Sequence, residues 1–212
     1  VVLGVVSTGK YFAPAIVARL RKACPEIEVL LQIGNRDAII GALQDGALDL
    51  AIMGRPPREP VLDALSLGDH PHVLIAPPDH PLVGAAEITP DDLLRETILM
   101  REQGSGTRIL ATRFLDRIGE GKTYERAEMG TNETIKQAVI AGLGVALISY
   151  HTVVEELRSG RLVTLDLPGL PIMRHWFLLH PAETPLSGAA RTVWQFIATE
   201  KDSFLPHWPP EG

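Results

Sequence analysis

Apolar and polar positions of this chain follow one another in blocks typical of strands that alternate with helices. The opening run, 1–6, is almost entirely apolar, as expected for a strand covered on both faces of a parallel sheet. Similar runs predict strands at 27–33 and 48–53, and apolar positions at helical spacing predict helices over 12–20 and 35–46. This strand–helix order predicts a parallel sheet with right-handed crossovers.

The alternation of strands and helices is interrupted at residues 65–81 and then resumes. Two short strands, 65–67 and 73–76, are predicted on either side of the turn-forming sequence 68–71, and the proline-rich sequence 77–81 breaks the chain. Beyond it the predicted elements are a helix from Pro90 capped by Thr89, strand 97–100, helix 107–118, strand 123–128, helix 133–141, strand 145–149, a helix ending at 159, strand 162–165, strand 174–179 and helix 187–199.

This order predicts an α/β fold made of two Rossmann-like subdomains that two crossing strands join. We expect residues 1–76 to begin subdomain I, residues 77–171 to form subdomain II, and residues 172–212 to return and complete subdomain I. In such a hinged pair a ligand binds between the units, at the carboxyl ends of the strands.

Two Ser/Thr/Gly-rich turns follow predicted strands, one in each unit. Ser7-Thr8-Gly9 follows the first strand, and Gly104-Ser105-Gly106-Thr107 follows strand 97–100. A helix start carries N–H groups without intrahelical acceptors and a partial positive charge, so it attracts anions. The two turns therefore predict a clamp for a small acidic ligand, with Thr107 as a helix cap. Plain helix capping is the alternative.

Other polar residues stand at the predicted carboxyl ends of strands. Arg108 lies in the first turn of a helix, where a cation is unfavourable, so Arg108 or Arg101 is expected to face an acidic ligand; an ion pair with Glu102 is the alternative. The complete set of candidate ligand-binding residues is Ser7, Thr8, Gly34, Asn35, Arg101, Ser105, Gly106, Thr107, Asn132 and Ser149.

Composition narrows the possible partners and compartments. The net charge is −6 and no basic stretch is interleaved with aromatic residues, so this chain is not expected to grip nucleic acid itself. Cys24 is the only cysteine, which excludes an intrachain disulfide and fits a reducing, cytoplasmic location. The sequence predicts no membrane helix, and because it starts inside a strand we expect it to be part of a longer protein.

Signals for catalysis or cofactors are weak. His70 and His72 share one face of a predicted strand, but no third metal ligand accompanies them, so no metal site is predicted. There is no Gly-x-Ser-x-Gly elbow and no phosphate loop, and Gly142 and Gly144 end a helix rather than open one. We therefore expect no enzyme activity and no cofactor.

Several segments together resemble the effector-binding domain of LysR-type transcriptional regulators. They are Leu-Gln-Asp-Gly-Ala-Leu-Asp-Leu-Ala-Ile-Met at 43–53, Val-Leu-Ile-Ala-Pro-Pro-Asp-His-Pro-Leu at 73–82, Arg-Glu-Gln-Gly-Ser-Gly-Thr-Arg at 101–108, and 135–149. Within the family, 101–108, 132–136 and 174–176 are most similar to the CbbR group, which regulates carbon-dioxide-fixation operons.

The resemblance implies a type-2 periplasmic-binding-protein fold, a ligand pocket between subdomains, and homodimers or homotetramers. It also implies a winged helix-turn-helix domain, absent from this chain, that binds DNA. The implied effector is a small anionic metabolite; for the CbbR group, effectors include ribulose bisphosphate, phosphoenolpyruvate, NADPH and ATP. The alternatives are a solute-binding protein of a transport system and a bilobal enzyme such as a dehydratase.

Overall fold

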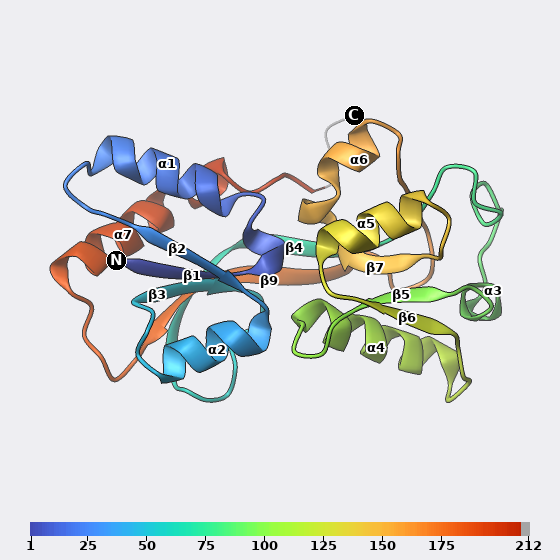
Figure 1. Cartoon of the computed structure of the whole chain (residues 1–212), viewed down its shortest axis with the longest axis horizontal. Helices are drawn as coiled ribbons and strands as arrows, with labels where there is room; N and C mark the ends of the chain where they lie inside the picture. The colour runs from blue at the N-terminus through green and yellow to red at the C-terminus, as the bar shows by residue number, and fades with distance from the viewer. Residues whose placement is uncertain (209–212) are drawn as a thin grey trace. The chain divides into compact units, whose positions relative to one another are not determined.

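The computed structural model describes residues 1–208, which fold as two compact units (Figure 1). Unit 1 contains residues 1–70 and 174–208, and unit 2 contains Pro71–Met173. The chain passes from one unit to the other twice, within β4 (Leu62–Ala76) and within β9 (Ile172–Pro181). The boundaries expected from the sequence, after residues 76 and 171, lie at the end of β4 and just before β9.

Unit 1 is built on a mostly parallel sheet in the order β2-β1-β3-β9. Strand β1 pairs in parallel with β2 and β3, as the sequence predicts, and β9 runs antiparallel to β3. Apart from β4 and β9, its elements are β1 (Val2–Val6), η1 (Ser7–Gly9), α1 (Ala13–Ala23), β2 (Leu30–Gly34), α2 (Arg36–Gln44), β3 (Leu50–Met53), α7 (Gly188–Glu200) and η3 (Lys201–Ser203).

Helices cover both faces of the unit 1 sheet. Figure 1 shows α1 and α7 on one face and α2 on the other. Helix α1 buries Ile16 and Leu20, which stand one turn apart and so share a face. These side chains belong to one apolar core with the sheet residues Leu3 and Ile52 and the fully buried Trp176 of β9. The core therefore holds the end of β1 in place.

Unit 2 also alternates strands with helices. The end of β4 pairs antiparallel with both β7 and β8, and β5 pairs in parallel with β6. A single bridge between Ile98 and Val145 joins β5 to the start of β7. The remaining elements are α3 (Pro90–Leu94), β5 (Ile98–Arg101), α4 (Gly106–Gly119), β6 (Arg126–Met129), α5 (Asn132–Ile140), β7 (Ala146–Ser149), η2 (Tyr150–Thr152), α6 (Val154–Arg158) and β8 (Val163–Leu165).

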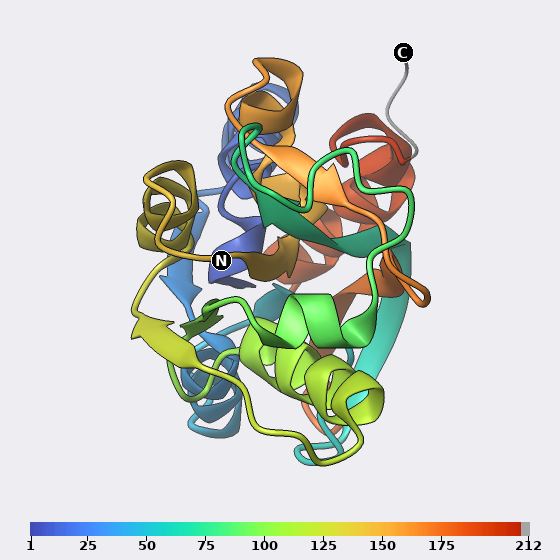
Figure 2. The same cartoon turned by 90° about the vertical axis from the view of Figure 1, so that its right-hand side faces the viewer.

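The helices of unit 2 gather around its strands and enclose a second apolar core. Figure 2, which turns unit 2 toward the viewer, shows α3 beside α4. Phe114 and Leu115 of α4 pack with Leu93 of α3 and with Met100 of β5 in this core. The predicted Thr89 cap of α3 is confirmed, and Asp92 completes a capping box with it.

The sequence-based prediction of two strands around the turn 68–71 is wrong, because β4 is continuous from Leu62 to Ala76. Gly68 has a φ of +150°, a conformation that only glycine adopts readily, and this lets the strand continue. A side chain there would also collide with Leu205, whose Cδ1 lies 2.9 Å from the position of a Cβ atom. The strand predicted from residue 27 begins only at Leu30, because Ile27 N–H donates to the Cys24 carbonyl in a turn.

Candidate functional site

The first Ser/Thr/Gly turn, in unit 1, does not open α1. Residues Ser7–Gly9 form a single 3-10 turn after β1, and α1 begins at Ala13 with Phe12 at its N-cap position. The expectation that this turn starts the helix is therefore wrong. Gly9 is required by packing, because a Cβ atom there would lie 2.5 Å from Val5 Cγ1. The turn offers the hydroxyls of Ser7 and the buried Thr8, but not a long helix start.

Asn35 acts as a helix cap in unit 1. It follows Gly34, the last residue of β2, and its Oδ1 atom accepts a hydrogen bond from Ala38 N–H at 3.0 Å. The neighbouring Arg36 is a residue that the sequence analysis missed: its Nη1 donates to the Arg55 carbonyl at 2.6 Å. Burial lowers the pKa of the Arg36 guanidinium; Arg55 lowers it further, while Asp37 opposes the shift.

The second turn, in unit 2, does open a long helix. Gly104 has a φ of +87°, which favours glycine, and Ser105 occupies the N-cap position of α4, with Gly106 as the first helical residue. The predicted cap, Thr107, lies instead inside the first turn, and no side chain caps this helix. Ser105 and Thr107 are buried. Because α4 is fourteen residues long, its start carries the partial positive charge of a helix dipole.

Arg101, the last residue of β5, is buried and engaged by acceptors of unit 2. Its Nε atom lies 2.7 Å from Glu102 Oε2, and its Nη2 atom lies 2.8 Å from Glu102 Oε1. Its Nη1 atom donates to Asn132 Oδ1. The side chain of Arg101 is 2% exposed and that of Glu102 is 23% exposed. The ion pair with Glu102, the alternative that the sequence left open, is therefore present.

Arg108 is also paired with a carboxylate. Its Nη1 atom donates to Glu128 of β6 and, at 2.9 Å, to the Arg101 carbonyl. The guanidinium therefore joins the first turn of α4 to β5 and β6, and the carboxylate balances its charge. Arg108 has a structural role that explains a cation at this unfavourable position.

Asn132 is the most deeply buried of the candidate residues at the helix starts. It is the first residue of α5 and is 1% exposed, whereas the preceding residue, Thr131, caps the helix through Thr134 N–H at 3.1 Å. Asn132 Oδ1 accepts from Arg101, but within residues 1–208 its buried Nδ2 atom has no acceptor. A buried amide without an acceptor is costly, so this donor is a candidate contact for a ligand.

A further group of buried polar residues adjoins the same helix. Ser149 ends β7, and its carbonyl accepts from the Thr152 hydroxyl at 2.7 Å. Lys136, one turn after Asn132 in α5, donates to the Thr152 carbonyl at 3.0 Å and pairs with Glu156 of α6. Sequence analysis missed Lys136 and Thr152, because a lysine inside a helix gives no sign that it is buried.

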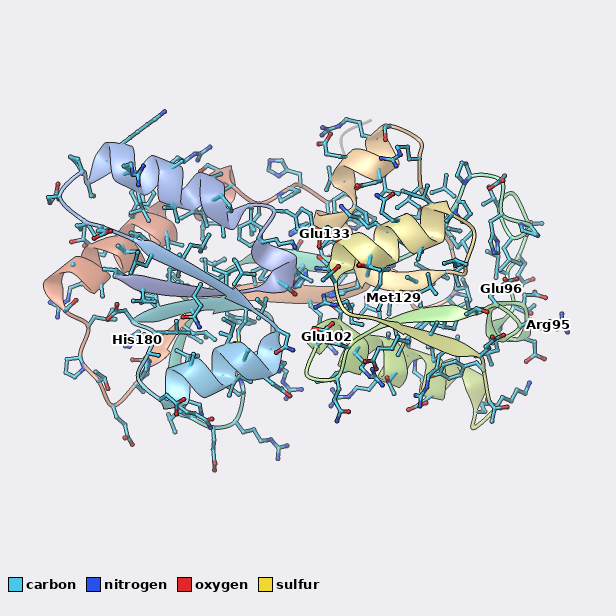
Figure 3. The ribbon with its side chains drawn as sticks, in the orientation of Figure 1. Arg95, Glu96, Glu102, Met129, Glu133 and His180 are labelled. Atoms are coloured by element: carbon cyan, nitrogen blue, oxygen red, sulfur yellow. The ribbon has the colours of Figure 1, made fainter. Side chains whose placement is uncertain are left out.

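Unit 2 thus brings together Arg101, Ser105, Thr107 and Asn132 at the starts of α4 and α5. Figure 3 shows Glu102, after β5, and Glu133, in the first turn of α5, at the same end of unit 2. The arrangement can offer helix N–H groups, hydroxyls and one amide donor to an anion. Ser7, Thr8, Gly34 and Asn35 belong to unit 1, at the ends of β1 and β2.

The described part of the chain holds no cluster of three or more His, Cys, Asp or Glu residues suited to a metal ion. His70 instead stacks on Trp176, with ring centroids 3.8 Å apart. None of the helices within residues 1–208 is long and apolar enough to cross a membrane.

Comparison with known proteins gives matches along almost the whole chain. The chain is 56% identical to the HTH-type transcriptional regulator CbbR of Cereibacter sphaeroides, over 99% of this chain and 67% of that protein. It is 49% identical to CbbR of Xanthobacter flavus, over 99% of this chain and 63% of the relative. The chain therefore spans about two thirds of the length of these curated relatives.

Solved structures agree with these matches. The regulatory domain of CcmR from Synechocystis PCC6803, in complex with 2-PG, is 36% identical, with a TM-score of 0.88 over 96% of this chain and 97% of that one. The effector-binding domain of QuiR in complex with shikimate, at 19% identity and a TM-score of 0.79, shares the fold over 97% of this chain and 98% of that one. The fold is the type-2 periplasmic-binding-protein fold, as the family resemblance implies. The family model for the LysR substrate binding domain matches residues 1–202, and the chain belongs to this family.

Proposed function

We propose that this chain is the effector-sensing part of a CbbR-like transcriptional regulator, in which a small anionic ligand binds at the starts of α4 and α5. DNA binding resides in a segment outside this chain. The names of the relatives support the regulatory role, and the acidic net charge of −6 fits a module that does not contact DNA itself. We expect this regulator to work in the cytoplasm.

The buried Nδ2 atom of Asn132 carries the proposal for the site. Within residues 1–208 it has no acceptor, and it stands at the start of α5 beside Arg101. A ligand oxygen would satisfy this donor and, at the same time, interact favourably with the partial positive charge of the helix starts. Thr107 and Ser105 add hydroxyls at the start of α4.

An anionic ligand fits this donor set better than a neutral one. Helix N–H groups and an amide NH2 group donate hydrogen bonds, ligand oxygens accept them, and negative oxygens form the stronger hydrogen bonds. The 36% identical regulatory domain of CcmR is solved with 2-PG, which makes 2-PG the first probe to test. The chain binds its ligand without converting it, as a regulator requires, and needs no cofactor.

The substitution Asn132→Asp tests the site sharply. It keeps an oxygen for Arg101 but replaces the amide donor by an acceptor that carries negative charge. We expect affinity for 2-PG, measured by calorimetry, to fall at least about tenfold, since a hydrogen bond to a charged group contributes roughly 1.5–3 kcal/mol. Gln137→Glu makes the same change of charge on the exposed side of α5 and should leave the affinity unchanged. Equal affinities of Asn132→Asp and wild type would refute the assignment.

The sequence-based hypothesis that the turns of both units hold one ligand stays a prediction. Calorimetry with one ligand and the variants Ser7→Ala and Thr107→Val, alone and combined, tests it: each substitution should lower the affinity, and an affinity that Ser7→Ala leaves unchanged would contradict a shared ligand. The expected homodimer or homotetramer also stays a prediction, which sedimentation of the purified chain addresses.

A further inference from the structure

The guanidinium of Arg101 already forms an ion pair with a carboxylate of the same chain. Glu102 takes both the Nε and the Nη2 positions, at 2.7 and 2.8 Å, which is the two-pronged geometry that a ligand phosphate or carboxylate would use. Asn132 Oδ1 accepts a hydrogen bond from Nη1 of the same guanidinium. The buried cation therefore stands at the candidate ligand site with its charge compensated.

The backbone of Glu102 is fixed at the turn, whereas its side chain is partly exposed. Its backbone carbonyl accepts from Ser105 N–H at 3.3 Å, so the backbone is tied to the start of α4. Its side chain, at 23% exposed, is far more accessible than that of Arg101, at 2%. A rotation of the Glu102 side chain toward solvent would leave the Arg101 fork open toward an incoming anion.

We propose that Glu102 is the specificity-determining residue of this site: it acts as an internal competitor that selects ligands by their charge. An anion near Arg101 either displaces the Glu102 carboxylate or is repelled by it. A monocarboxylate ligand only replaces one carboxylate at Arg101 by another, so it gains little binding free energy. A phosphate group gains more, because it brings a second negative charge and further oxygens for Asn132 Nδ2 and the N–H groups of α4. The inference rests on the proposed function, because it concerns the same ligand site.

The nearby pair of Arg108, in α4, and Glu128, in β6, provides a matched comparison. Both pairs join an arginine of 101–108 to one carboxylate. However, the side chains of Arg108 and Glu128 are 23% and 56% exposed, so solvent screens their charges. Glu102→Gln and Glu128→Gln therefore change the net charge equally, and only the first removes a carboxylate from a buried arginine.

Calorimetry at constant ionic strength, with inorganic phosphate, acetate and 2-PG as separate probes, tests the proposal. We expect Glu102→Gln to tighten phosphate and acetate binding at least about tenfold, because both anions then meet Arg101 without a competing carboxylate. Glu128→Gln should stay within about twofold of wild type. Unchanged or weaker anion binding in Glu102→Gln would overturn the proposal and make Glu102 a residue that only positions Arg101.

Two further measurements separate this result from simple structural effects. Glu102→Asp keeps the charge but shortens the side chain, so its phosphate affinity should lie between those of wild type and Glu102→Gln. Phosphate should also raise the melting temperature of Glu102→Gln more than that of wild type, by mass action on the folded state. If neither wild type nor any variant binds any of the three anions, the proposed function itself fails. If wild type binds them and Glu102→Gln gains nothing, only the role of Glu102 fails.

Discussion

Lys136 of α5 and Glu156 of α6 form a largely buried ion pair, with Nζ and Oε1 3.0 Å apart and side chains 9% and 14% exposed. The same ammonium group donates to the Thr152 carbonyl. The pair therefore joins the helix that begins at Asn132 to the segment after β7. A buried charge that loses its partner is costly, so each of the two residues depends on the other.

Replacing one member of this pair should destabilise the chain strongly. Lys136→Met leaves the Glu156 carboxylate buried without its lysine, and we expect a loss of about 3 kcal/mol in the free energy of unfolding, measured in urea. Combining it with Glu156→Gln should recover much of that loss. The exposed pair of Lys122 and Asp91 is the control, and Lys122→Met should cost less than about 1 kcal/mol. Equal losses at the two lysines would contradict the buried pair.

The capping box of α3 predicts a pH dependence. Hydrogen bonds from the Thr89 side chain and backbone, in that order of size, hold the pKa of Asp92 below its ordinary value of 3.8. Because the pKa is lower in the folded chain, the ionised Asp92 stabilises the fold at pH values above the pKa of the unfolded chain. This stabilisation is lost as the pH falls through the pKa of the folded chain. Thr89→Val should therefore raise the pKa of Asp92 and weaken that dependence below pH 3.8. An NMR titration of the Asp92 carboxyl group measures it, and an unchanged pKa would contradict the capping geometry.

Gly144 is predicted to tolerate no side chain. A Cβ atom there would lie 2.2 Å from the Thr97 carbonyl oxygen, which accepts a hydrogen bond from Val145 N–H. We expect Gly144→Ala to cost at least about 2 kcal/mol in chemical denaturation, since the backbone of β5 or β7 must shift. Gly41→Ala is the control, because nothing lies within 4 Å of that position inside α2, and it should stabilise by about 0.5–1 kcal/mol.

The segment after α7 should stabilise unit 1, although the family model ends at residue 202. Phe204 stacks on Phe12 with ring centroids 6.0 Å apart, and Phe12 in turn meets Trp176 edge-to-face at 5.0 Å. We expect Phe204→Ala to lower the free energy of unfolding by about 1–3 kcal/mol, read by calorimetric melting. Phosphate affinity should not change. A melting temperature equal to that of wild type would show that the aromatic stack contributes nothing.

Features set by neighbouring residues could be predicted from the sequence. The Thr89 cap of α3 and the parallel pairing of β1 with β2 both follow from signals within one element or one crossover. The turn predicted at 68–71 is absent, because strand pairing along β4 and the conformation of Gly68 override the local turn preference of these residues.

The candidate site was only partly accessible to the same reasoning. Position at strand ends identified Arg101, Ser105, Thr107 and Asn132, all of which the structure buries in unit 2. The ion pair of Arg101 with Glu102 was left open as an alternative, because a carboxylate beside an arginine in sequence can point either way. The pairing of Arg108 with Glu128 needs β6 to lie beside β5, a relationship between distant segments that no local pattern records.

The most direct measurement follows the side-chain amide of Asn132 by ¹H–¹⁵N NMR. The chain has two asparagines, Asn35 and Asn132, so a protein with ¹⁵N-labelled asparagine side chains gives two amide groups that Asn132→Asp assigns. The Asn132 amide resonances should move on addition of 2-PG, and their titration should give the same dissociation constant as calorimetry. Binding of 2-PG that leaves the Asn132 amide unmoved would contradict the proposed site.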